Sequence, residues 1–127
     1  MQEHGKYKIV RNGNVIHSYF DYAINLECSI AYFKKLKKTV QDIENWVSYV
    51  HTTTNSMGTP DSISYSTELN LQLPSWGCAA CVIHVSNIMV DDFSEKTQMV
   101  SSIPFLSSKN ETELNDFIQL FTESQSN

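Results

Sequence analysis

Residues 46–85 constrain the fold of this chain more than any other segment. A β-branched and aromatic run at 46–50 is followed by a helix-start signal at 59–61, a glycine at position 77 and a second apolar run at 81–85. Threonine is a favoured N-cap, proline fits the first helical position, and glycine adopts the left-handed conformation that ends many helices. This order predicts a βαβ unit with two parallel strands, and a site beyond the carboxyl end of the first strand.

Residues 62–73 are ambiguous. Apolar and polar residues alternate there, which is typical of a half-buried strand. The same segment carries an apolar stripe at helical spacing, formed by Tyr65, Leu69, Leu73 and Trp76. We expect a helix over 60–76, because both boundaries suit a helix and a parallel crossover then follows, although Pro74 should bend or shorten its last turn. A strand stays the alternative.

The remaining segments predict a leading hairpin and further alternating strands and helices. Asn12-Gly13 suits a tight hairpin turn, and Asn25 suits the N-cap of an amphipathic helix. The expected elements are strands at 7–10 and 15–20, a helix at 25–40, a strand at 79–87, a short helix at 91–99, an edge strand at 103–106, and a final helix capped near Ser108 or Asn110. We therefore expect an α/β fold: a mixed, mostly parallel five-stranded sheet with about four helices, in one domain over 1–127 whose termini, 1–5 and 123–127, are frayed.

Charge and hydropathy limit the classes of partner. Seven basic and five acidic residues give positions 1–60 a net charge of +2, whereas two basic and nine acidic residues give positions 61–127 a net charge of −7. The acidic half argues against nucleic-acid binding, which needs a basic surface. No apolar run is long enough to span a bilayer, and the first residues lack the apolar core of a signal peptide, so we expect a cytoplasmic protein without membrane insertion.

The chain resembles the STAS-like (SpoIIAA-like) family, which comprises the domains of anti-sigma-factor antagonists and the small bacterial proteins grouped with them. The resemblance depends on the leading hairpin, the helix after Asn25, the aromatic strand at Trp46, the Thr59-Pro60 helix start and the turn WGCAACVIHVSN. It implies a regulatory, non-catalytic module that docks a protein partner, such as a kinase or an anti-sigma factor, near residues 52–61; a homodimer is left open. Ser56 corresponds to the position that is phosphorylated in antagonists, with Gly58 and Thr59 beside it.

Two other functions are left open by the sequence. The wider fold group includes lipid-transfer domains of the CRAL-TRIO type, and this resemblance implies a small-molecule or lipid-binding protein. A cavity of several hundred Å³ lined by Tyr65, Leu69 and Trp76, with His51 at the strand end, would favour that function. The acidic half alone suggests a third function, inhibition of a basic protein.

The sequence offers little support for catalysis, and we expect neither an enzyme nor a bound cofactor or metal. Cys78 and Cys81 have the spacing of a redox pair, but they lead into a strand, where residues three apart should point to opposite faces. A zinc site built from these two and His84 would need a fourth ligand from elsewhere. His51 is best interpreted as a polar residue at a strand end.

Overall fold

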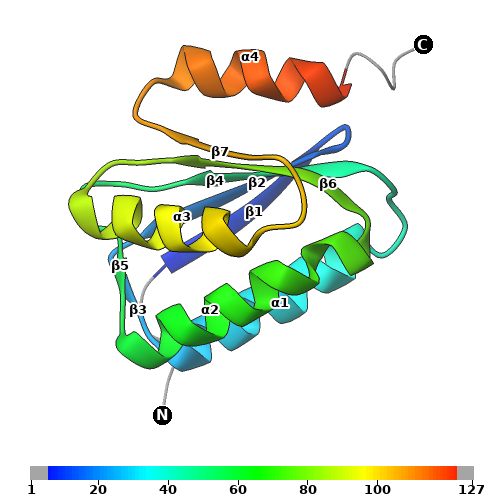
Figure 1. The fold of residues 1–127 in the computed structure, drawn as a ribbon. Helices are drawn as coiled ribbons and strands as arrows, with labels where there is room; N and C mark the ends of the chain where they lie inside the picture. Colours follow the sequence, from blue (N-terminus) through cyan, green and yellow to red (C-terminus); the bar gives the residue numbers. More distant parts are fainter. Residues whose placement is uncertain (1–5, 123–127) are drawn as a thin grey trace.

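The structure is a computed structural model that describes residues 6–122. The frayed termini expected at 1–5 and 123–127 lie outside the described residues. In chain order, the elements are β1 (Lys6–Asn12), β2 (Val15–Asp21), β3 (Ala23–Ile24), α1 (Leu26–Val40), β4 (Trp46–His51), β5 (Met57–Gly58), α2 (Pro60–Gln72), the 3₁₀ helix η1 (Leu73–Trp76), β6 (Cys78–His84), α3 (Ile88–Val100), β7 (Phe105–Ser108) and α4 (Glu111–Thr122) (Figure 1).

The main sheet is mixed and mostly parallel, as predicted. Its five strands lie in the order β1-β2-β4-β6-β7. β1 and β2 form the antiparallel hairpin, and each later neighbouring pair is parallel. The described residues thus form an α/β fold with four α-helices around a five-stranded sheet.

Residues 60–76 are helical, which resolves the ambiguity of that segment. Pro60 occupies the first turn of α2, and Gly77 ends η1 with a φ of 93°. The chain changes from α-helix to 3₁₀ helix at Leu73, next to Pro74. Proline has no N–H for an α-helical hydrogen bond, so the predicted shortening of the last turn is confirmed.

Helices cover both faces of the sheet (Figure 1). One face packs against α1 and α2 around the buried residues Ile16, Leu36 and Trp46. The opposite face packs against α4, where Leu114 and Ile118 contact the β4 and β6 side chains that point the other way. The core therefore has two layers of side chains, one on each side of the sheet.

Several details differ from the sequence-based expectations. α3 begins at Ile88 rather than at 91, because the Asn87 side chain accepts a hydrogen bond from Val90 N and caps the helix earlier. The Asn110 alternative is confirmed for α4: its Oδ1 accepts from Thr112 N and Glu113 N. The short parallel pair β3–β5 was not predicted, since each strand has only two residues.

The placement of Cys78 and Cys81 on opposite faces was wrong. The register of β4 against β6 shifts between Trp46 and Val47, so Cys78 pairs with Trp46 while Ala80 pairs with Val47. This bulge turns both cysteines to the same face, with their sulfur atoms 3.8 Å apart. Both are buried, and the contact with Cys78 together with burial raises the pKa of the Cys81 thiol, which therefore stays protonated at neutral pH.

Candidate functional site

A cavity of about 120 Å³ lies between the sheet and the helices on the α1–α2 side. Its sheet wall is formed by Phe20, Val50 and Ile83, which lie in the carboxyl halves of β2, β4 and β6. Residues of α1, α2 and α3 form the other walls. Parallel strands bring their carboxyl ends to one edge of a sheet, and this is the edge at which the sequence predicted a site.

The lining of the cavity is uncharged and mostly apolar. No Asp, Glu, Lys, Arg or His side chain is among its lining residues, all of which belong to the described part of the chain. The polar side chains include Ser29 of α1 and Ser66 and Asn70 of α2. A charged group placed inside would lose its hydration without gaining a counter-charge, so the cavity suits a neutral occupant.

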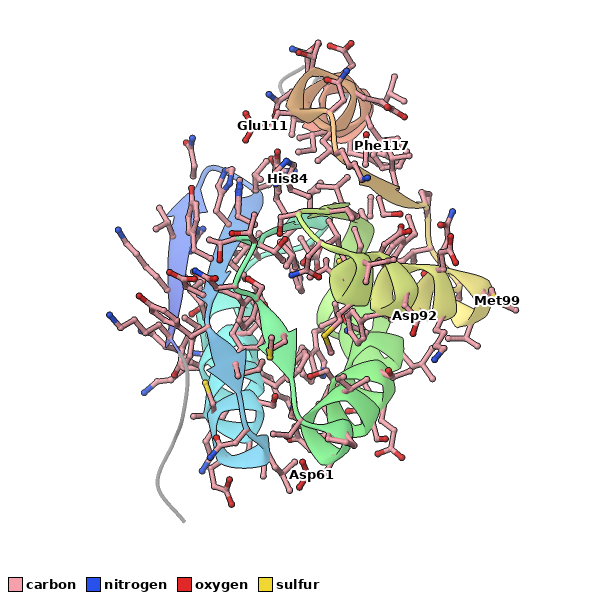
Figure 2. All side chains as sticks on the ribbon, turned by 90° about the vertical axis from the view of Figure 1, so that its left-hand side faces the viewer. Asp61, His84, Asp92, Met99, Glu111 and Phe117 are labelled. Atoms are coloured by element: carbon pink, nitrogen blue, oxygen red, sulfur yellow. The ribbon has the colours of Figure 1, made fainter. Side chains whose placement is uncertain are left out.

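The cavity meets solvent near two methionines. Met57 on β5 and Met89 on α3 both line it, and each is 46% exposed. Figure 2 looks at the molecule from this side, with Asp61 at the start of α2 and Asp92 on α3. Methionine side chains are unbranched and flexible, so this rim can adapt to the shape of a bound molecule.

Gly58 allows β5 to lie close against α2 at the edge of the cavity. A Cβ at this position would lie 2.8 Å from the Ser62 Oγ and 3.0 Å from the Ile63 side chain. The Ser62 hydroxyl in turn lies within hydrogen-bond distance of Ile24 O and Thr59 O, at 3.2 and 3.1 Å. Gly58 therefore matters for this close approach. Its φ is not among the positive values, so the close approach, and not a left-handed backbone conformation, is what requires a glycine here.

Ser56 is part of the internal structure of its loop. It is only 4% exposed; its Oγ donates to Phe20 O at 3.0 Å and accepts from Thr53 N at 2.8 Å. Asn87 Nδ2 donates to Ser56 O at 2.6 Å and holds the loop against the start of α3. A kinase would have to open this loop to reach the hydroxyl. Thr59 serves as the N-cap residue of α2, with its Oγ1 donating to Asp61 Oδ1 at 2.6 Å.

His51 lies on the opposite face of the sheet, in a cluster of aromatic rings. It stacks on Tyr49 and Tyr19, with ring centroids 3.9 and 4.3 Å apart. His51 Nε2 and His17 Nδ1 share a hydrogen bond of 2.8 Å, in which one ring donates and the other accepts. Burial, with smaller contributions from His17 and His84, lowers the pKa of His51 to about 4, and burial also lowers the pKa of His17.

Acidification is expected to destabilise the protein through this histidine pair. Unfolding returns both rings to water, where the pKa of histidine is about 6.5, so the unfolded state binds more protons as the pH falls below 6.5. The stabilisation from neutral His51 is full above that pH and is lost towards pH 4. Urea unfolding at pH 7, 6 and 5 should show a declining free energy of unfolding, and His51→Gln should flatten the decline. If the free energy of unfolding declines equally with pH in the parent protein and in His51→Gln, the decline does not come from His51.

The other three residues expected at a ligand pocket belong to the packed core. Tyr65, Leu69 and Trp76 contact the buried cluster around Trp46, and Lys37 Nζ lies 5.5 Å from the centre of the Trp76 ring. The cavity is instead lined by the next stripe of α2, which carries Ser62, Ser66 and Asn70 at spacings of four. That polar stripe was the available sequence signal, but polar residues on a helix normally indicate the solvent face.

The comparisons with known proteins give no family assignment. The chain matches no protein-family model, and no curated protein is significantly similar to it in sequence. Within residues 6–122, no three His, Cys, Asp or Glu side chains gather in a way that could hold a metal ion. No helix in the same part of the chain has the length and apolar character needed to cross a membrane.

Proposed function

We propose that this protein is a non-catalytic binding module for a small, uncharged and largely apolar molecule, which it holds in the cavity beside α1, α2 and α3. The observation that carries the proposal is the cavity itself: an uncharged, mostly apolar space at the carboxyl ends of parallel strands. Binding sites in α/β sheets lie preferentially at that edge, and apolar pockets with a few polar groups are the usual form of small-molecule sites.

The size of the cavity indicates the size of the ligand. An engineered apolar cavity of about 150 Å³ in another protein binds benzene. A cavity of about 120 Å³ therefore suits one ring or a short branched chain, with room for more where Met57 and Met89 move. This volume is below the several hundred Å³ of drug-sized pockets, so the proposal is a small ligand, or the end of a longer one.

This proposal develops the ligand-binding alternative drawn from the resemblance to lipid-transfer domains. The function that the family resemblance predicted first, a regulatory module that docks a protein partner near residues 52–61, stays a prediction. Its phosphorylation switch requires access to Ser56, whose hydroxyl is buried and hydrogen-bonded. Ser56→Asp and Ser56→Ala variants that retain the same partners as the parent protein would exclude such a switch.

A cavity-filling substitution tests the proposed function. Ser66→Leu should place three extra carbon atoms in the cavity, whereas Ser64→Leu makes the same change on the exposed side of α2. Both changes alter helix propensity equally, so Ser64→Leu is a matched control. Toluene is expected to raise the Tm of the parent and of Ser64→Leu, because a ligand that binds only the folded state stabilises it, and to leave Ser66→Leu unchanged.

NMR chemical shifts can also locate the bound toluene. Toluene should shift backbone amide resonances of α2, β5 and α3 in the parent protein, and those shifts should be absent in Ser66→Leu. An unresponsive parent protein at saturating toluene, or equal responses from both leucine variants, would contradict the proposed function.

A further inference from the structure

Two serines from different helices lie next to each other in one wall of the cavity. Ser29 lies on α1 and Ser66 on α2, and their Oγ atoms are 3.5 Å apart. Ser29 is only 1% exposed, and both residues line the cavity. A hydroxyl hydrogen bond is normally 2.7–2.8 Å long, so a separation of 3.5 Å is at the outer limit of such an interaction.

The long separation leaves hydrogen-bonding capacity in the cavity wall. Each hydroxyl carries one donor and two acceptor sites, and among residues 6–122 the polar partner of Ser29 Oγ is this distant Ser66 Oγ. Other buried hydroxyls have shorter hydrogen bonds: Ser18 Oγ and Tyr32 Oη are 2.6 Å apart, and Ser94 Oγ donates to Val90 O at 2.8 Å. Burying a hydroxyl without a good partner costs free energy, so a polar atom that lies within reach of both serines would be stabilised.

Asn70 adds a further polar group to the same wall. Its Nδ2 donates to Ser66 O at 2.8 Å, which fixes the amide along α2, and the residue lines the cavity. Ser29, Ser66 and Asn70 thus lie on the wall formed by α1 and α2, while Phe20, Val50 and Ile83 form an apolar wall on the sheet. An occupant that matched both walls would be apolar on one side and carry a polar atom on the other.

We infer that the ligand of this cavity carries one uncharged oxygen function, a hydroxyl or a carbonyl, which hydrogen-bonds to Ser29 and Ser66. This inference rests on the proposed function and specifies the chemical class of the ligand. Because the lining holds no charged side chain, the oxygen function is neutral and not a carboxylate or a phosphate. A site that hydrogen-bonds a polar group on its ligand discriminates against the analogue that lacks it, because its own buried groups then stay unpaired.

Phenol and toluene test the inference, since they differ by a hydroxyl in place of a methyl group of similar size. Dissociation constants for both are measured by NMR titration in the parent protein, in Ser29→Ala and in Ser66→Ala. Toluene is the more hydrophobic probe, so the informative quantity is the ratio of the two constants in each protein. We expect each serine-to-alanine change to shift this ratio by about tenfold towards toluene.

Ser64→Ala is the matched control, because Ser64 is exposed on the same helix and should leave the ratio unchanged. Circular dichroism confirms that each variant folds; if Ser29→Ala does not, Ser66→Ala decides alone, because Ser66 is less deeply buried. A ratio that stays the same in the folded serine variants overturns the inference while leaving toluene binding, and with it the proposed function, intact. A parent protein that binds neither probe overturns both.

Discussion

Replacing Trp46 by alanine is expected to lower the free energy of unfolding by about 3–5 kcal/mol, the usual cost of removing a large buried aromatic side chain. Trp46 is 0% exposed and begins the central strand β4. Its indole Nε1 donates to Trp76 O at 2.9 Å, so the side chain also ties the end of the α2–η1 crossover to the sheet. Urea denaturation followed by circular dichroism measures the loss.

Trp46→Phe separates the two contributions of this side chain. Phenylalanine keeps most of the apolar contact but cannot donate to Trp76 O, so a smaller loss is expected. Trp76→Ala serves as the comparison, because that side chain is only partly buried and takes part in the hydrogen bond through its backbone. A loss below about 1 kcal/mol for Trp46→Ala would contradict the full burial and the hydrogen bond that the structure gives this side chain.

The central crossover could be predicted because several independent signals agreed. Thr59, Pro60 and Gly77 each favour a helix boundary where the structure has one. The competing alternation over 62–73 arises because the segment carries polar residues on two sides of a helix. Ser64 and Glu68 face solvent, whereas Ser66 and Asn70 line the cavity. Polar residues on an interior side weaken the usual amphipathic pattern and imitate the alternation of a strand.

The cavity itself could not be predicted, because it depends on distances between elements that are far apart in the sequence. Phe20, Ser29 and Ile83 come from three separate elements, and no local pattern indicates that a space stays open between them. The contact between Cys78 and Cys81 could not be predicted either, for the same reason. The bulge opposite Trp46 is a property of the pairing between β4 and β6, and β6 alone contains no signal for it.

Tyr32→Phe is expected to lower the free energy of unfolding by about 1–3 kcal/mol, although it removes a single oxygen atom. Tyr32 Oη and Ser18 Oγ form a 2.6 Å hydrogen bond; the tyrosine is 4% exposed and the serine 0%. Burial raises the pKa of Tyr32 far above its ordinary value, so the phenol is neutral under all ordinary conditions. The substitution leaves the Ser18 hydroxyl in the centre of β2 without this partner.

The double variant distinguishes a lost hydrogen bond from a general packing defect. If an unpaired Ser18 hydroxyl causes the loss, Ser18→Ala combined with Tyr32→Phe should recover much of the stability, because replacing both partners by apolar groups is nearly neutral. Tyr19→Phe is a control on β2, the strand that carries Ser18, because Tyr19 is 41% exposed and its hydroxyl can be hydrated. Additive losses in the double variant would mean that the two hydroxyls stabilise the fold independently.

Tyr32 also lines the cavity, so recovery with unchanged toluene affinity would show that this buried pair supports the cavity wall without contacting the ligand.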